Sequence, residues 1–265
     1  MDAALLRSTV RAPAGPYAAV DVVPSTGSTN ADLRAAAGAG AADYTVLLAE
    51  AQTAGVGRLG RTWASPVGAG LYLSVLLRPS GVPAQHLGSL AVVAGLALAD
   101  VAGAAGVDVR LKWPNDVLAP GGKIAGVLSE LVPGDGANAV VLGMGLNVHP
   151  LGDVPAGPGD VPATSLEESG ARDSDRSALA VALLRALADR ERAWRSAAGD
   201  LGAAGLLDAY RAACVTLGSR VRVSLPDGQS VDGDGADIDA AGQLVVATGD
   251  GGRTTVFAGD VVHVR

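Results

Sequence analysis

A glycine- and arginine-rich segment is the first candidate for chemistry in this sequence. Residues 55–63 read Gly-Val-Gly-Arg-Leu-Gly-Arg-Thr-Trp. Glycine lets a backbone turn its N–H groups toward an anion, and the arginine guanidinium donates several hydrogen bonds to phosphate oxygens. The segment does not match the GxxxxGK[ST] pattern of phosphate-binding loops. It predicts a loop that holds a phosphorylated ligand, with an ordinary exposed loop as the alternative.

A second cluster, at residues 112–116, reads Lys-Trp-Pro-Asn-Asp and follows the alternating apolar and polar run 107–111. Such alternation predicts a strand with one buried face. Pro114 cannot donate a ladder hydrogen bond, so the strand should stop there and place Asn115 and Asp116 in a turn at its end. Turns in this position often carry functional side chains.

Two further segments are strand-like and contain residues suited to a site. Residues 122–130 place Lys123 at the start of an apolar run. Residues 143–148 are interrupted by Gly143 and Gly145, and glycines inside a strand indicate that a ligand or another backbone approaches closely. A lysine at the start of a strand is also compatible with a solvated edge charge, so neither segment is decisive alone.

The last candidate segment, residues 26–30, reads Thr-Gly-Ser-Thr-Asn and precedes a helical run. Here Thr29 could cap the helix with Asp32 at the third helical position, which would leave Ser28 and Asn30 free to bind a ligand. A helix cap without any ligand is the simpler explanation of this segment taken alone. The order of all five segments in one chain is the informative observation.

The elements that must position these segments alternate between strand and helix. Strand-like runs lie at 18–23, 44–50, 71–78, 107–113, 123–132 and 139–148, and helical runs lie at 30–37 and 84–105. This pattern predicts an α/β (α+β) fold with a mixed sheet and helices packed on one face. A Pro/Gly-rich loop follows at 150–162, and then two helices at 174–198 and 201–213.

From Leu217 the period of the sequence changes to two, which is typical of strands. Strands are expected at 220–225, 243–247 and 254–257, with a turn at Pro226-Asp227-Gly228 after the first of them. The last part of the chain therefore reads as a small all-β module of SH3-like type.

Together the five segments resemble the biotin protein ligase (biotin-[acetyl-CoA-carboxylase] ligase) family. The motifs that carry the resemblance are TGSTN at 26–30, QTAGxGRxGRxW at 52–63, KWPND at 112–116, GKIAG at 122–126 and GxGxN at 143–147. The likeness extends from about Val22 to the C-terminus. It implies a biotin- and ATP-binding catalytic domain at 1–216 and a C-terminal SH3-like domain at 217–265.

The family resemblance also implies a two-step reaction and roles for named residues. Biotin would react with ATP to give biotinyl-5'-AMP, and a lysine of a biotin carboxyl carrier domain would then take the biotinyl group. Preorganised cations and N–H donors are the expected catalysts, because negative charge collects on oxygens in both steps. The implied catalytic residues are Lys123, Arg58 and Asp116.

Binding residues follow from the same motifs. The implied biotin-binding residues are Ser28, Thr29, Asn30, Gln52, Val56, Gly57, Arg58 and Lys123. The implied ATP- and adenylate-binding residues are Arg58, Arg61, Trp63, Lys112, Asn115, Lys123, Gly145 and Asn147. Whether Lys112 pairs with Asp116 or with ligand oxygens stays open. Mg²⁺ is expected to be held mainly by phosphate oxygens and water, without a protein-built metal site.

Composition narrows the classes of function. The formal net charge of −7 argues against broad attraction to nucleic acid. One cysteine, Cys214, forms no disulfide framework and suits a reducing cytoplasm. No signal peptide is expected, and the apolar run 87–106 reads as a buried amphipathic helix and not a membrane span. About twenty residues before the first strand leave no room for a DNA-binding domain, so the monofunctional class is expected, as a monomer or weak homodimer.

One position departs from the family pattern. Members usually show arginine where this chain has Val56, so the loop has one cation fewer. Two alternatives to a biotin ligase remain at this stage: a lipoate or octanoyl protein ligase of the same superfamily, and a biotin-sensing protein without catalysis. The KWPND and loop motifs favour biotin over lipoate, and the presence of Lys123 favours an enzyme over a sensor.

Overall fold

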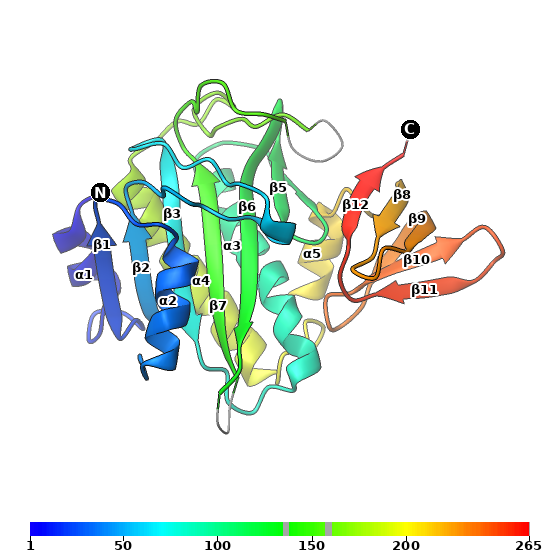
Figure 1. The fold of residues 1–265 in the computed structure, drawn as a ribbon, viewed down its shortest axis with the longest axis horizontal. Coiled ribbons are helices and arrows are strands. Elements are labelled where there is room, and N and C mark those ends of the chain that lie inside the picture. Colours follow the sequence, from blue (N-terminus) through cyan, green and yellow to red (C-terminus); the bar gives the residue numbers. More distant parts are fainter. Residues whose placement is uncertain (135–137, 157–160, 265) are drawn as a thin grey trace.

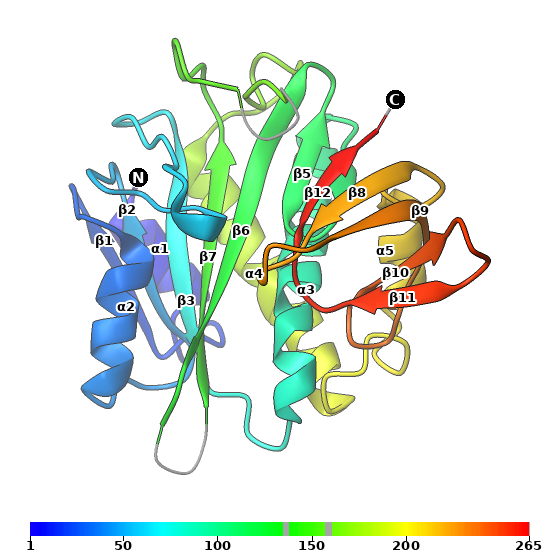
Figure 2. The ribbon, with the colours of Figure 1, turned by 45° about the vertical axis from the view of Figure 1, so that its right-hand side comes forward.

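A computed structural model describes residues 1–134, 138–156 and 161–264 of the chain. A seven-stranded mixed sheet and a five-stranded antiparallel sheet lie side by side (Figures 1 and 2). The order in the larger sheet is β1-β2-β3-β7-β6-β5-β4. Its strands are β1 (Ala19–Val23), β2 (Thr45–Ala49), β3 (Gly70–Leu77), β4 (Arg110–Lys112), β5 (Asp116–Ala119), β6 (Gly122–Val132) and β7 (Ala139–Asn147). The β1–β2 pair is parallel, and the other neighbours are antiparallel.

Helices cover both faces of the larger sheet. Figure 1 shows α2 (Thr29–Gly38) in front of the strands and α3 (Leu90–Ala104) and α4 (Arg176–Ser196) behind them. Every residue of β3 is buried, and its apolar side chains pack in two separate clusters, one with α3 and α4 and one with α2. The mixed α/β class is confirmed, but the expectation that the helices pack on one face is wrong for α2. A central strand without polar alternation needs cover on both sides.

The apolar segment at 87–106 forms part of the core, as expected. It contains the end of the 3₁₀ segment η2 (Ala84–Ser89) and all of α3. Helix α3 is buried on most of its circumference instead of along one stripe. By length and composition the helix Ala84–Ala104 could cross a membrane, and 67% of its most apolar window is buried inside the protein. Contacts with the sheet and with α4 account for that apolar composition.

Several element boundaries differ from the sequence-based expectation. Helix α1 (Ala3–Val10) was not expected, and α5 (Leu207–Ala213) is shorter than the predicted helix at 201–213. Leu201 instead donates its N–H to Ala240 O at 2.9 Å, and Gly205 adopts φ +70°, which ends the turn before α5. In the predicted loop at 150–162, residues 150–156 and 161–162 have no helix or strand, and residues 157–160 lie outside the described ranges.

The smaller sheet has the order β11-β10-β9-β8-β12. Its strands are β8 (Arg220–Ser224), β9 (Ser230–Ile238), β10 (Leu244–Thr248), β11 (Arg253–Val256) and β12 (Asp260–His263). Sequence periodicity did not predict β9, because glycine and aspartate, which are depleted in strands, fill much of it. It also did not predict the short β12. An all-β C-terminal module is confirmed, whereas the SH3-like type stays a prediction.

The side chains of Trp113 and Arg211 help to join the smaller sheet to the rest of the molecule. The indole Nε1 of Trp113 donates to Gly242 O at 2.9 Å, and the backbone N–H of Trp113 donates to Thr216 Oγ1 at 3.0 Å. Arg211 in α5 forms a bidentate pair with Asp237 in β9 at 2.8 and 3.0 Å. The tryptophan of the KWPND motif is therefore a buried residue of this junction.

Candidate active site

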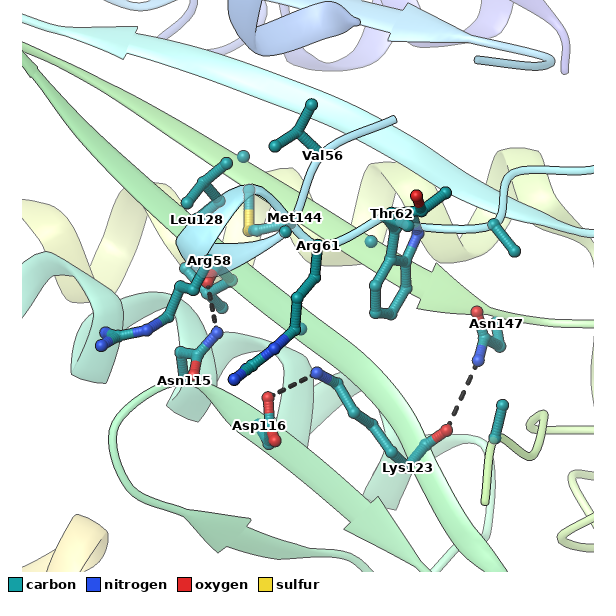
Figure 3. Close-up of a pocket in the computed structure, with 18 of the residues that line it drawn as sticks. Val56, Arg58, Arg61, Thr62, Asn115, Asp116, Lys123, Leu128, Met144 and Asn147 are labelled. Carbon is teal, nitrogen blue, oxygen red and sulfur yellow. Dashed lines mark hydrogen bonds and ion pairs between the residues drawn. The ribbon is translucent and has the colours of Figure 1, made fainter. Parts of the chain in front are cut away.

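A cavity of about 810 Å³ lies above the centre of the larger sheet, which is a size suited to a small-molecule ligand. Its walls come from the start of α2, the segment 52–64, strands β3 to β7, residues of 151–156 and 161–163, and β12. Figure 3 shows lining side chains from the segment 52–64 and from β5, β6 and β7. All fifteen predicted site residues line it: Ser28, Thr29, Asn30, Gln52, Val56, Gly57, Arg58, Arg61, Trp63, Lys112, Asn115, Asp116, Lys123, Gly145 and Asn147. Tertiary structure therefore brings the five sequence segments to one place.

Strand β7 sets the arrangement of the cavity. Residues two apart on a strand face the same side, so Gly143, Gly145 and Asn147 follow one another along it. A Cβ atom at Gly143 would lie 2.2 Å from Asn30 Oδ1, and one at Gly145 would lie 2.5 Å from the Trp63 ring. The two glycines thus make room for side chains from other segments, as close approach requires.

We call Ser28, Thr29, Asn30 and Gln52 the α2 end of the cavity. Ser28, with extended φ −159°, is the N-cap of α2, and its Oγ accepts from Ala31 N at 3.5 Å. The prediction that Thr29 caps the helix is wrong. Thr29 is the first helical residue, and its hydroxyl donates to Gln52 Oε1 at 3.1 Å. Ser28 reaches the free helical N–H first because its backbone is still extended.

Asn30 and Gln52 are also bonded within the protein. The amide nitrogen of Asn30 donates to Glu130 Oε2 at 2.7 Å and to Leu128 O at 3.2 Å. The Oδ1 of Asn30 accepts from Ser74 Oγ at 2.5 Å. Sequence reasoning missed Ser74 and Glu130, because neither belongs to a recognisable motif. The α2 end is consequently a connected network of hydrogen bonds.

The glycine- and arginine-rich segment folds as a small hairpin over the cavity. Val56 and Thr62 form an antiparallel bridge, and a 3₁₀ turn, η1 (Arg58–Gly60), closes the hairpin. Gly60 adopts φ +72°, which favours glycine, whereas a Cβ at Gly55 would lie 2.6 Å from Trp63 O. The N–H of Gly57 donates to Arg61 O at 2.6 Å. That N–H, predicted to contact ligand, is used inside the hairpin.

We call Arg58, Arg61, Trp63, Lys123 and Asn147 the cationic side of the cavity. Each of its three cations has a protein acceptor. Lys123 Nζ lies 2.5 Å from Asp116 Oδ1 (Figure 3), Arg61 pairs with Asp260, and Arg58 Nη2 donates to Gly259 O at 3.0 Å. Lys123 Nζ also lies 5.3 Å from the centre of the Trp63 ring. Burial lowers the pKa of Arg58.

The structure bears on one half of the open question about Lys112, its pairing with Asp116; its contact with ligand oxygens stays a prediction. Lys112 and Asp116 are cross-strand partners between β4 and β5, yet the ion pair that Asp116 makes within the described ranges is with Lys123. Lys112 is 7% exposed, and burial lowers its pKa. Asn115 donates its side-chain amide to Val127 O at 2.8 Å, so it ties the turn to β6. A turn at 113–115 is confirmed, while Asp116 already belongs to β5.

Three buried side-chain polar atoms in the described part of the chain have no hydrogen-bond partner. They are Arg58 Nε, Trp63 Nε1 and Asn147 Oδ1, and all three belong to the cationic side. Leaving such atoms unpaired costs roughly 1–3 kcal/mol each. A ligand that offers acceptors to the two nitrogens and a donor to Asn147 would recover that free energy.

Residues from the smaller sheet also line the cavity, which the motifs did not predict. Asp260 and Val261 in β12 face it, and Asp260 holds Arg61. No sequence signal marked Asp260, because it lies almost 200 residues from its partner. The cavity is therefore built from both sheets.

Comparisons with known proteins show which family this chain is similar to. Residues 22–147 match the model of the Biotin/lipoate A/B protein ligase family, and residues 216–264 match that of the Biotin protein ligase C terminal domain. The biotin–[acetyl-CoA-carboxylase] ligase of Mycobacterium tuberculosis is 49% identical over 93% of this chain and 89% of that protein. The enzyme of the same name from Paracoccus denitrificans is 36% identical over 89% of this chain and 97% of its own length.

Among solved structures, the biotin protein ligase from Aquifex aeolicus in complex with biotin and ATP has a TM-score of 0.77 with this chain. It is 26% identical, and the match covers 94% of this chain and all of that one. The two family models, the extended identity to the relatives and the shared fold lead to one conclusion: this chain belongs to the biotin protein ligase family.

Proposed function

We propose that the protein is an ATP-dependent biotin protein ligase that forms biotinyl-5'-AMP and transfers biotin to a lysine of a biotin carboxyl carrier domain. The observation that carries this proposal is one cavity with a hydrogen-bonded polar end and a side rich in cations and unpaired polar atoms. A ligand with a polar ring at one end and a phosphate and a base at the other matches that division. The names of the relatives support the same reaction.

The first step joins biotin to AMP. A carboxylate oxygen of biotin attacks the α-phosphorus of ATP, a P–O bond forms, and pyrophosphate leaves. Negative charge grows on the phosphate oxygens, so a cation positioned beforehand lowers the barrier. We assign that role to Lys123, whose ammonium would exchange Asp116 for ligand oxygens, and to Arg58 in the hairpin above it.

The second step transfers the biotinyl group. The uncharged amine of the acceptor lysine attacks the carbonyl carbon, the C–O bond to AMP breaks, and the amine loses a proton. Asp116 is our candidate to orient that amine or accept its proton, because its carboxylate lines the cavity beside Lys123. Once Lys123 turns to the ligand, the Asp116 carboxylate becomes available.

Ligand recognition divides between the two parts of the cavity. Ser28, Thr29, Asn30 and Gln52 would meet the polar groups of the biotin ring system, with Val56 and Gly57 above it. Asn147 and Trp63 would recognise the adenine, because each has a buried polar atom without a partner. Arg61, Lys112, Asn115 and Gly145 line the remaining wall, where Arg61 and Lys112 would add positive charge near the phosphates.

Mg²⁺ would enter with the triphosphate. No group of three or more His, Cys, Asp or Glu side chains gathers as a metal site in the described ranges, and the cavity carboxylates Asp116 and Asp260 are each paired with a cation. This donor set fits an ion held mainly by phosphate oxygens and water, which would neutralise the leaving pyrophosphate.

We further propose a catalytic domain at 1–216 and a C-terminal domain at 217–265, in a cytoplasmic protein that is monomeric or a weak homodimer. The division is supported by the separate sheets and by the family match that begins at residue 216. Buried Cys214 suits a reducing compartment. Neither a nucleic acid nor a membrane is expected as a partner.

Intact mass of the carrier tests the function directly. The protein is incubated with ATP, Mg²⁺, a biotin carboxyl carrier domain and either biotin, lipoate or octanoate. We expect one biotinyl group on the carrier and no transfer of the other acids. Transfer of lipoate or octanoate would support the alternative ligase, and biotin binding without any transfer would support a sensor.

A further inference from the structure

The polarity of the α2 end is set by a residue outside the cavity wall. Both hydrogens of the Asn30 amide are used, because Nδ2 donates to Glu130 Oε2 at 2.7 Å and to Leu128 O at 3.2 Å. Because the carboxylate and the carbonyl can only accept, the Asn30 side-chain atom that faces them must be the amide nitrogen. The Asn30 side chain can therefore offer only a lone pair of Oδ1 to a ligand.

Ser74 completes this arrangement from the other side. Ser74 is fully buried, and its Oγ lies 2.5 Å from Asn30 Oδ1 and 2.7 Å from Thr29 Oγ1. The Thr29 hydroxyl hydrogen points to Gln52 Oε1, so the Ser74 hydroxyl hydrogen serves Asn30 or Thr29. Even when Asn30 Oδ1 accepts from Ser74, it keeps a second lone pair for the cavity.

Gln52 is fixed with the opposite polarity. Its Oε1 accepts from both the N–H and the hydroxyl of Thr29, at 2.9 and 3.1 Å. Its Nε2 donates one hydrogen to Ser65 Oγ at 3.0 Å and keeps one for the cavity. The α2 end thus presents an acceptor at Asn30 and a donor at Gln52, which complements a ring that carries both N–H and C=O groups.

Glu130 is the residue on which this polarity depends. A carboxylate accepts but cannot donate, so the Asn30 amide cannot flip and still be satisfied. Arg34 in α2 forms an ion pair at 2.5 Å with the other Glu130 oxygen, which holds the carboxylate in place beside Asn30. Glu130 itself does not line the cavity, and it acts through Asn30.

We propose that Glu130 is a positioning residue that determines ligand specificity. By fixing Asn30 as an acceptor, it makes the site select a cyclic urea N–H and reject rings that lack an N–H donor at this position. This inference rests on the proposed function, because it assumes that the ring of biotin occupies the α2 end. The consequence is a preference set by the polarity of one amide and not by cavity shape alone.

The test compares Glu130→Met with Glu130→Gln, which keeps a side-chain acceptor at the same length. Binding of biotin, of biotin methylated on a ureido nitrogen, and of ATP is measured by calorimetry, with Tm recorded for each variant. In E130M we expect biotin affinity to fall about tenfold, the effect of one buried hydrogen bond, and the preference for biotin over the methylated ring to fall by a similar factor. E130Q keeps an acceptor, but its amide can also donate and so can face a flipped Asn30; it should restore biotin affinity and the preference only in part, and ATP affinity should stay within about twofold.

The outcomes separate this inference from the proposed function. If wild type binds biotin and E130M keeps the full preference, Glu130 does not set specificity. Equal losses of biotin and ATP affinity, or a lower Tm with an unchanged preference, would show a purely structural role and overturn the inference. If wild type itself fails to bind biotin, the proposed function is wrong as well.

Discussion

The α2 end and the cationic side of the cavity differ in how their polar side chains are hydrogen-bonded. In the α2 end the polar side chains bind one another, and Asn30, Thr29 and Gln52 all have protein partners. On the cationic side three buried polar atoms lack partners, and the cations are held by a carboxylate or a carbonyl that a ligand can replace. One part is organised before ligand arrives, and the other is completed by it.

This difference has an energetic meaning. A preformed network loses little conformational freedom on binding, so it suits selection of one ring. Unpaired atoms and exchangeable ion pairs gain most when charge appears on the ligand, and only interactions that strengthen in the transition state raise the rate of the chemical step. We therefore expect changes in the α2 end to alter affinity for biotin and changes on the cationic side to alter turnover.

Removing the central cation should have the largest effect. Lys123→Ala should lower ATP–pyrophosphate exchange by at least about a hundredfold, roughly 2.7 kcal/mol, because charge stabilisation at the α-phosphate is lost. Biotin affinity should change much less. Lys112→Ala is the matched control and should lower exchange less than Lys123→Ala. Exchange within about threefold of wild type in the Lys123 variant would refute its assignment.

Two glycines on β7 allow the same substitution in both regions. Gly143→Ala would collide with Asn30 and should raise KM for biotin about tenfold or more, whereas Gly145→Ala would collide with Trp63 and should raise KM for ATP by a similar factor. Gly145→Ala should also shift tryptophan fluorescence. Gly103→Ala in α3, where a Cβ meets nothing within 4 Å, is the control. If both variants changed KM for biotin and KM for ATP in the same way, the proposed difference between the two regions would be wrong.

Restoring the family's arginine should strengthen the cationic side. Val56 is 46% exposed in the hairpin, so Val56→Arg gains a partly exposed charge-assisted contact. We expect biotinyl-5'-AMP to dissociate more slowly by at most about tenfold, as followed by stopped-flow tryptophan fluorescence. Val56→Gln controls for side-chain length without charge. A slowing of a hundredfold or more would mean that Val56 is not a tolerated change.

Releasing Arg61 from Asp260 in the smaller sheet should also strengthen ligand binding at the cationic side, but by less than Val56→Arg. In Asp260→Asn the Arg61 guanidinium loses its competing carboxylate and becomes free for phosphate, so KM for ATP should fall about two- to fivefold. Asp232→Asn is the matched control, because it breaks the ion pair at 2.7 Å between Arg222 on β8 and Asp232 on β9, away from the cavity. It should leave KM for ATP unchanged. A rise in KM for ATP would show that Asp260 supports Arg61 instead of competing for it.

The smallest expected effect concerns pH. Burial, and then the charge of Lys112, lower the pKa of His263 in β12 below its ordinary 6.5. The unfolded chain then binds the proton more readily, so stability is full above 6.5 and falls as pH drops through the folded pKa. Urea unfolding of wild type and His263→Gln between pH 7 and pH 5 should show a shallower loss in the variant. Parallel curves would contradict this.

Much of the candidate site follows from residue types and spacing. A strand-like apolar run predicted β7, two glycines in it marked Gly143 and Gly145 as points of close approach, and proline ended the strand before Asn115. These features are local, because a φ angle, a missing N–H or a missing Cβ acts within a few residues. Their roles in catalysis and binding stay predictions.

Prediction from the sequence failed in two situations. Either two neighbouring residues could play the same structural role, or the interacting residue lies far away along the chain. Both Ser28 and Thr29 can cap a helix, and the backbone conformation at Ser28 decided for the first. The sequence left open whether Lys112 pairs with Asp116; the strand register places these two residues opposite each other, yet it is Lys123 on β6 that forms the ion pair with Asp116. Glycine-rich β9 was missed because its pairing partners, not its own residue types, make it a strand.

By itself the sequence determined the mixed α/β class, six of the seven strands of the larger sheet and fifteen of the residues that line the cavity. Tertiary structure alone decided that α2 covers the second face of the sheet, that Asp260 reaches Arg61 from the smaller sheet, and that Glu130 orients Asn30. The physical reason is the separation along the chain between the residues that interact. Side-chain chemistry and backbone preference are properties of single residues. The partner of a charge or an amide depends instead on sheet register and packing, which bring together residues about a hundred or more positions apart.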